Sequence, residues 1–228
     1  LMPQHLVEFT LTYPQVIGGY TPECTEKADR FFSLTNEQRN MTDLATAQMI
    51  KVSENALRDT QIAFLNELSG ICQEIGIDVY EVLDHMRDVE PLVPGPRGGH
   101  CLPKDNELEV YGVHRKLERD NMLVAARDVN NAVSDYIVDA LLGKELGLKD
   151  LEGKKIVLLG GSYLEGTEDV RESRSIYVAE LLRQRGAEVI VHDPYVRADE
   201  HTNLWKEEAL RVNCLSAADV EVTDDFFY

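Results

Sequence analysis

The sequence predicts an α/β fold in which an all-helical central part, built around one long helix, is followed by a parallel sheet. Two observations predict it. Apolar residues recur at helical spacing through residues 42–75, and strand, helix and strand patterns alternate after residue 153. The 228 residues are 43% hydrophobic, which is ordinary for a globular protein with a core.

The first 40 residues combine a short β-like run at 15–19 with a helix that Thr21-Pro22-Glu23 opens. Threonine can cap a helix, and proline fits its first position. The chain does not begin with Met, so we expect a fragment of a longer protein. Residues 1–40 are then the remnant of a preceding domain.

Thr42-Asp43 signals the start of the long helix, and Gly76 offers a C-cap. With roughly 34 residues at 1.5 Å each, the helix would span about 50 Å. One small domain does not need that length, so we interpret the helix as a dimerisation spine. A second, short helix is expected at 78–88.

A loop rich in Pro and Gly follows at 91–99, because these residues cannot continue either regular structure at such density. Another amphipathic helix is expected at 121–144. The predicted βαβ unit has strands at 155–159 and 188–192 and a helix at 173–185, and its apolar strands imply a buried parallel sheet. A short helix is expected around 205–212. We therefore divide the chain into 1–40, 41–149 and 150–228.

Lysine and arginine number 23 against 41 acidic residues, which gives a formal net charge of −18. Such a surface repels polyanions and argues against nucleic acid and membranes as partners. The four cysteines form no C-x-x-C pair, so neither a metal site nor a disulfide framework is expected. No apolar run approaches the roughly 20 residues of a membrane span, and we expect a cytoplasmic protein.

Three short segments carry candidate chemistry, beginning with Gly98-Gly99-His100-Cys101 and Asp105. Two glycines let the backbone approach a ligand, and cationic neighbours favour the reactive thiolate form of a cysteine. A carboxylate four residues later could orient a water molecule. From the residues alone, an ordinary semi-buried cysteine remains the alternative.

In the second segment Lys51, Asn55 and Asp59 recur every four residues, which stacks them on one helix face. They fit an oxyanion-stabilising group or a solvated polar stripe. In the third, the Gly160-Gly161 turn leads towards a helix, which makes it a possible anion site, although it does not match G-x-G-x-x-G. Arg171 could bind a phosphate or pair with Asp169 or Glu172.

Taken together, these segments resemble the UDP-glucose/GDP-mannose dehydrogenase family. The resemblance covers nearly the whole chain. Its matching pieces are Val16-Ile17-Gly18-Gly19, residues 51–67 as K-x-x-E-N-x-x-R-D-x-x-I-A-F-x-N-E, Gly76-Ile77-Asp78, residues 94–105, Ala126-Arg127 with Asn130, residues 169–173 as D-V-R-E-S, and residues 193–196 as D-P-Y-V.

The resemblance implies two NAD-dependent oxidations of a sugar's C6 alcohol to a carboxylate, through a thiohemiacetal and a thioester on cysteine. By position, Cys101 matches the nucleophile, Asp105 the acid/base residue, and Lys51 with Asn55 the pair that stabilises oxyanions and holds the water. The residues that match substrate contacts are Arg58, Gly95, Gly98, Gly99, His100 and Arg171. Arg171 matches an arginine that reaches the partner subunit's site, so a homodimer is expected.

The resemblance also implies a helical dimerisation and catalytic domain at 41–149 and a Rossmann-like UDP-sugar-binding domain at 150–228. Residues 1–40 would be the remnant of the family's N-terminal NAD-binding domain, which is otherwise not in this sequence. His100 with Arg58-Asp59 is similar to members that act on UDP-2-acetamido sugars. We therefore expect UDP-N-acetylmannosamine as substrate, with UDP-N-acetylglucosamine next. A GDP-mannose dehydrogenase would share Cys101 and Lys51 but not the combination of Arg58-Asp59 with His100.

The chain departs from the family pattern at several positions. Residues 94–99 match the loop that packs around the sugar nucleotide in the family, but this loop is one residue shorter than usual and contains Arg97. Leu164-Glu165 stands where Lys-Pro is customary. Asn106 and Arg174 each replace a customary proline. These changes fit natural divergence of an active enzyme, or a catalytically silent paralogue that keeps a UDP-sugar pocket and a dimerisation helix.

Overall fold

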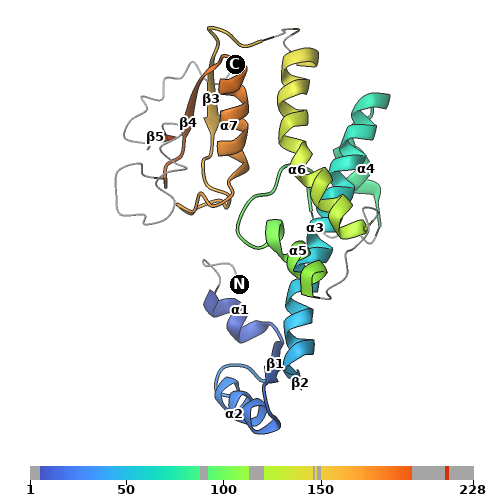
Figure 1. Cartoon of the computed structure of the whole chain (residues 1–228), viewed down its shortest axis with the longest axis vertical. Helices are drawn as coiled ribbons and strands as arrows, with labels where there is room; N and C mark the ends of the chain where they lie inside the picture. The colour runs from blue at the N-terminus through green and yellow to red at the C-terminus, as the bar shows by residue number, and fades with distance from the viewer. Residues whose placement is uncertain are drawn as a thin grey trace.

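The computed structural model describes residues 6–87, 92–112, 121–145, 147, 150–196 and 214–215. The long helix α3 runs lengthwise along one side of the molecule, from the N-terminal unit towards α4 (Figure 1). A small N-terminal unit lies at one end of α3, and the C-terminal sheet lies beside α6, away from that unit. The predicted α/β class, with its long helix and its parallel sheet, is confirmed.

The N-terminal unit consists of α1 (Leu6–Thr12), β1 (Gln15–Gly19), α2 (Pro22–Phe32) and β2 (Arg39–Asp43). The strand at 15–19 and the helix after Thr21 are confirmed, and the Thr21 side chain accepts a hydrogen bond from the N–H of Cys24. Strands β1 and β2 pair in parallel, with Gln15 opposite Arg39. The sequence patterns did not predict α1 or β2.

Helix α3 (Leu44–Ile75) has 32 residues, close to the predicted length. The carboxylate of Asp43 caps its first turn by accepting from the N–H of Thr46 at 2.9 Å. Gly76 ends it in the left-handed region, with φ of 73°. Thr42 belongs to β2 and not to the helix, because Asp43 supplies the cap.

The predicted helix at 78–88 is the shorter α4 (Val79–His85), capped by Asp78. In the described part of the Pro/Gly loop, residues 92–99, no helix or strand forms. Helix α5 (Leu102–Gly112), which the sequence patterns missed, follows Cys101 directly. The predicted helix at 121–144 is α6 (Met122–Ala140), which the Asn121 side chain caps and which ends as a π-helical turn, η2 (Leu141–Glu145).

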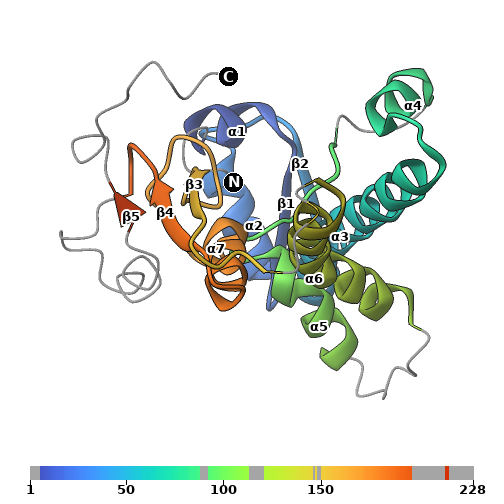
Figure 2. The ribbon, with the colours of Figure 1, turned by 90° about the horizontal axis from the view of Figure 1, so that it is seen from above.

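The C-terminal unit contains β3 (Lys155–Leu159), α7 (Arg174–Gln184), β4 (Glu188–His192) and β5 (Cys214–Leu215). The order is β3-β4-β5, all parallel, with Lys155 opposite Glu188, which confirms the βαβ unit. Helix α7 lies between this sheet and α6 (Figure 2). The core therefore joins side chains of the sheet and α7 to Val138 of α6 and Leu142 of η2.

The expected burial of both sheet faces is wrong for β3 within the described residues, because Val157 and Leu159 are exposed on the face away from α7. The helix expected around 205–212 lies outside the described residues. Among the helices described, none is both long and apolar enough to cross a lipid bilayer.

A hydrogen-bonded site that ends in the Cys101 loop

The residues predicted to be catalytic converge in the structure. On α3, the Lys51 ammonium donates to the side-chain oxygen of Asn55 at 3.2 Å. The Asn55 amide then donates to Asp105 of α5 at 2.6 Å, across 50 residues of sequence. The N–H of Asp105 donates to the carbonyl of Cys101 at 3.0 Å, which places Cys101 at the start of the same helical turn.

Asp105 is 4% exposed, so it needs partners for its charge. The Lys104 ammonium donates to its second oxygen at 2.6 Å. Burial alone would raise the pKa of Asp105, but the donors Lys104 and Asn55 and the charge of Lys51 together hold that pKa below its ordinary value. Asp105 is therefore held as an ionised acceptor, one helical turn after Cys101, whose thiol is exposed and free.

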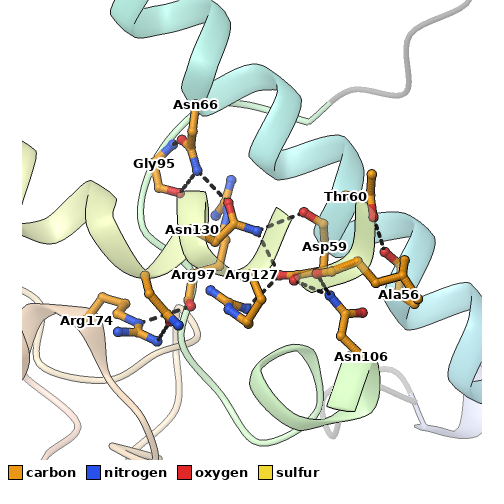
Figure 3. A network of polar contacts seen from close by, with 12 residues as sticks. Ala56, Asp59, Thr60, Asn66, Gly95, Arg97, Asn106, Arg127, Asn130 and Arg174 are labelled. Atoms are coloured by element: carbon orange, nitrogen blue, oxygen red, sulfur yellow. Dashed lines mark hydrogen bonds and ion pairs between the residues drawn. The ribbon is translucent and has the colours of Figure 1, made fainter. Parts of the chain in front are cut away.

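A second, buried network lies behind this row (Figure 3). Asp59 of α3 is fully buried and accepts from Arg127 at 2.7 Å, from Asn106 at 2.8 Å and from Asn130 at 2.9 Å. Burial raises the pKa of Asp59, against the lowering effects of Arg127 and the two amides. Asp59 thus connects α3 to α5 and α6, and through Asn106 it fixes the neighbour of Asp105.

The same network holds residues 92–100, the Cys101 loop, which directly precedes Cys101. The Asn66 side chain accepts from the N–H of Gly95 at 2.6 Å and donates to its carbonyl at 3.3 Å. It also donates to the Asn130 side chain at 2.9 Å, so the loop is linked to Asp59 (Figure 3). Sequence reasoning did not assign Asn66 a role. Its role could have been recognised from its spacing, because Asn66 lies eleven residues, or three helical turns, after Asn55 on a largely buried face.

Further along, the loop lies directly against the segment before α7. The N–H of Gly99 donates to the carbonyl of Arg171 at 3.1 Å. Gly98 lies so close to the carbonyl of Glu172 that no side chain would fit. Gly99 has φ of 90°, and a Cβ there would lie 2.8 Å from the Tyr163 ring. Both glycines are therefore required by close approach of the backbone.

The remaining predicted substrate contacts are placed less closely together. Arg58 and His100 are exposed. The Arg171 guanidinium binds the Asp169 carboxylate with two nitrogens, including Nε at 2.9 Å from each oxygen. Pairing with Asp169 was one of the interpretations left open from the sequence. A role for Arg171 in a partner subunit stays a prediction.

Family models match the chain on both sides of this loop contact. The central domain of the UDP-glucose/GDP-mannose dehydrogenase family matches residues 45–132, and the UDP binding domain of that family matches residues 157–224. The chain belongs to the UDP-glucose/GDP-mannose dehydrogenase family. The Cys101 loop thus lies in the first family domain and contacts the second.

Named relatives agree with this family. The chain is 35% identical to an NDP-N-acetyl-D-galactosaminuronic acid dehydrogenase of Ralstonia nicotianae, over 97% of this chain and 52% of that protein. It is 32% identical to a UDP-N-acetyl-D-mannosamine dehydrogenase of Methanococcus maripaludis, over 98% and 52%. A solved UDP-D-ManNAc dehydrogenase from Pyrococcus horikoshii covers 90% of the chain at a TM-score of 0.75 and 28% identity, over 50% of its own length. The chain spans about half the length of the curated relatives it matches.

The glycine turn after β3 is not the anion site that its sequence suggested. The N–H groups of Gly161 and Ser162 donate to one oxygen of Asp193, at 2.7 and 3.0 Å. The N–H of Gly160 donates to the carbonyl of His192. The donors that would bind a phosphate are therefore occupied by the protein itself. This turn fits neither the phosphates of NAD nor its G-x-G-x-x-G motif, so a dinucleotide has no site here.

Two of the departures from the family pattern have visible roles. Asn106, in place of proline, donates to Asp59. Arg97 donates from Nη2 to the carbonyl of Val93 at 2.9 Å, which folds the shortened loop onto itself. Nothing in the structure explains why Leu164-Glu165 replaces Lys-Pro, although the Leu164 carbonyl accepts from Ser162 and Thr167.

Asp193 gives a prediction for stability and its pH dependence. Burial alone would raise its pKa, but four N–H groups, of Tyr195, Gly161, Ser162 and Val196, hold that pKa below its ordinary value. We expect Asp193→Ala to lower the free energy of unfolding by about 2–3 kcal/mol at pH 7, because buried donors lose their acceptor. A carboxylate whose pKa is lowered by folding stabilises the protein above its unfolded pKa of about 4 and loses this effect as the pH falls.

The difference between wild type and Asp193→Ala should therefore shrink below about pH 4. Urea unfolding at pH 7 and in the acid range measures it. Asp139→Ala is the matched control, because Asp139 forms only an exposed ion pair with Arg185 and should change stability little. An equal loss in both variants at pH 7 would contradict the role given to Asp193.

Proposed function

We propose that this chain forms the catalytic centre and the UDP-sugar site of a UDP-sugar 6-dehydrogenase, which oxidises the C6 hydroxyl of a UDP-2-acetamido sugar to a carboxylate. The observation that supports it most is the continuous row from Lys51 through Asn55 to Asp105, one helical turn after an exposed Cys101. A thiol, a cation, an amide and a carboxylate are the groups that oxidation through a thioester requires.

Each group has a distinct proposed task. The Cys101 thiolate adds to the C6 aldehyde to give a thiohemiacetal, whose oxidation gives a thioester. The Lys51 ammonium stabilises the oxyanion of the thiohemiacetal and the oxyanion that forms when water adds to the thioester, since a positioned cation favours developing negative charge. Asn55 and Asp105 hold and deprotonate the water that cleaves the thioester, which releases the carboxylate and the free thiol.

NAD is the proposed hydride acceptor for the two oxidations. The glycine turn that follows β3 offers its phosphates no site, because Asp193 occupies the N–H groups of Gly161 and Ser162. We infer that residues 1–40 are the remnant of the NAD-binding domain, followed by a helical dimerisation and catalytic domain at 41–149 and a UDP-sugar-binding domain at 150–228. The exposed Val16 and Met41 on the parallel β1–β2 pair support this, since parallel strands are normally covered on both faces.

The proposed substrate is UDP-N-acetylmannosamine, with UDP-N-acetylglucosamine as the alternative sugar. His100 and Arg58-Asp59 support an acetamido sugar, as do the names of relatives from Methanococcus and Pyrococcus. The competing function is a catalytically silent module that binds a UDP-sugar. The residues Leu164-Glu165, which stand where Lys-Pro is customary, favour it. The intact row from Lys51 to Asp105 favours the enzyme.

We also propose that the protein is a cytoplasmic homodimer in which α3 is the interface. Leu57, Phe64 and Ile71 recur every seven residues on α3 and are 60%, 56% and 53% exposed. Such a stripe along a 32-residue helix is typical of a helix that packs on a second copy. Sedimentation equilibrium measures the mass directly, and a monomer at micromolar concentration would contradict this proposal.

The proposed function is tested by calorimetric titration of the chain with UDP-N-acetylmannosamine, UDP-N-acetylglucosamine, UDP-glucose and GDP-mannose. We expect selective binding of the two acetamido sugar nucleotides. Tighter binding of UDP-glucose or GDP-mannose would overturn the substrate class. Turnover is then measured in a longer polypeptide that includes an NAD-binding domain, where binding without carboxylate formation would favour the silent module.

A further inference from the structure

Arg174 occupies the first position of α7, where the family resemblance leads one to expect proline. The backbone does not require arginine rather than proline at this position, because the first N–H of a helix has no intrahelical partner. Its side chain leaves α7 and lies against two other parts of the protein (Figure 3). The reason for arginine at this position must therefore be sought in those contacts.

The Arg174 guanidinium contacts three groups. Its Nε donates to the backbone carbonyl of Arg97 in the Cys101 loop at 3.3 Å, and its Nη2 donates to the side-chain oxygen of Asn131 on α6 at 3.1 Å. Its carbon Cζ lies 5.8 Å from the centre of the Tyr177 ring, within the range of a cation–π contact. One side chain of the UDP-binding domain thus holds both the loop and α6.

This contact adds to others along the same stretch. Gly99 donates to the Arg171 carbonyl, and Gly98 lies against the Glu172 carbonyl. Glu172 itself has φ of 48°, a left-handed conformation that is uncommon outside glycine. Three consecutive loop residues, 97, 98 and 99, therefore contact residues 174, 172 and 171 respectively, and Cys101 is two residues further on.

We propose that Arg174 is a positioning residue that fastens the Cys101 loop to the UDP-binding domain. Asn66 holds the loop at Gly95 from the central domain, and Arg174 holds it at Arg97 from the other side. The loop is fixed at both points before it reaches Cys101. That this attachment positions Cys101 for catalysis rests on the proposed function, whereas the attachment itself can be measured without any ligand.

Amide hydrogen exchange of the ligand-free chain tests the attachment. In Arg174→Ala we expect the Gly99 amide to exchange on the order of tenfold faster, because the loop opens more easily once the carbonyl of Arg97 loses its donor. Arg174→Lys can reach only one of the two acceptors and should give an intermediate rate. Arg174→Pro suits the first position of a helix and should exchange like the alanine variant without loss of α7.

Arg185→Ala is the matched control. Arg185 binds Asp139 of α6 at 2.8 Å from the opposite end of α7, so its loss removes a contact between α6 and α7 without touching the loop. Gly99 should keep its wild-type rate in that variant. Wild-type exchange at Gly99 in both Arg174→Ala and Arg174→Pro, or equal acceleration in Arg185→Ala, would overturn the proposal.

A second experiment tests the attachment of the loop separately from the proposed function. Exchange is repeated with saturating UDP-N-acetylmannosamine. Accelerated exchange in ligand-free Arg174→Ala supports the attachment even if the nucleotide protects nothing, a result that would count against the proposed substrate alone. Protection of residues 95–99 by the nucleotide together with an unchanged Arg174→Ala would count against the attachment alone.

Discussion

Cys101→Ser is expected to reduce carboxylate formation by at least about 1000-fold in a polypeptide that includes the NAD-binding domain. A serine hydroxyl at the start of α5 is largely protonated at neutral pH and adds poorly to an aldehyde. Without the covalent adduct neither a thioester nor its hydrolysis is available. The measurement is chromatographic detection of the UDP-uronate, with sugar-nucleotide binding followed in parallel by calorimetry.

Binding should stay within about twofold of wild type, because the substitution changes one atom of an exposed side chain. Cys24→Ser is the matched control, since Cys24 is also free and exposed but lies on α2, away from the loop. Wild-type carboxylate formation by Cys101→Ser would refute the covalent mechanism. Equal loss in Cys24→Ser would point to general damage from removing a thiol.

Asp59→Ala is expected to lower the free energy of unfolding by about 3–5 kcal/mol. Asp59 is fully buried and accepts from Arg127, Asn130 and Asn106, each on a different turn or helix. Its removal leaves the Arg127 guanidinium, with 7% of its side chain exposed, without its carboxylate. Urea denaturation followed by circular dichroism measures the change.

Asp59→Asn shows whether the charge or the volume of Asp59 matters, and Glu67→Ala is the control. Asp59→Asn keeps the shape but not the charge, and most of the loss should remain because Arg127 loses the negative charge of its ion pair with Asp59. Glu67→Ala removes a carboxylate from an exposed position on the same helix and should change the free energy of unfolding by less than about 0.5 kcal/mol. A stable Asp59→Ala would show that the network does not hold the three helices together.

Much of the fold could be predicted from local sequence. The βαβ unit was placed correctly because apolar strands and a Gly-rich turn are signals over a few residues. The limits of α3 followed from Asp43 and Gly76, whose capping roles depend only on their immediate neighbours. Helix α5 was missed because it follows a loop dominated by Pro and Gly signals, and β2 because its strand pattern is weak.

The candidate site divides in the same way. Helical spacing by itself placed Lys51 and Asn55 on one face, and the resemblance singled out Cys101 and Asp105. Only the tertiary structure joined Asn55 to Asp105, Asp59 to Arg127 and Arg174 to Arg97, pairs separated by 50, 68 and 77 residues. It also showed that Asp193 fills the glycine turn from 32 residues away. The spacing of residues along the sequence predicts which side chains are neighbours within one helix or strand, whereas contacts between elements depend on how their buried faces pack.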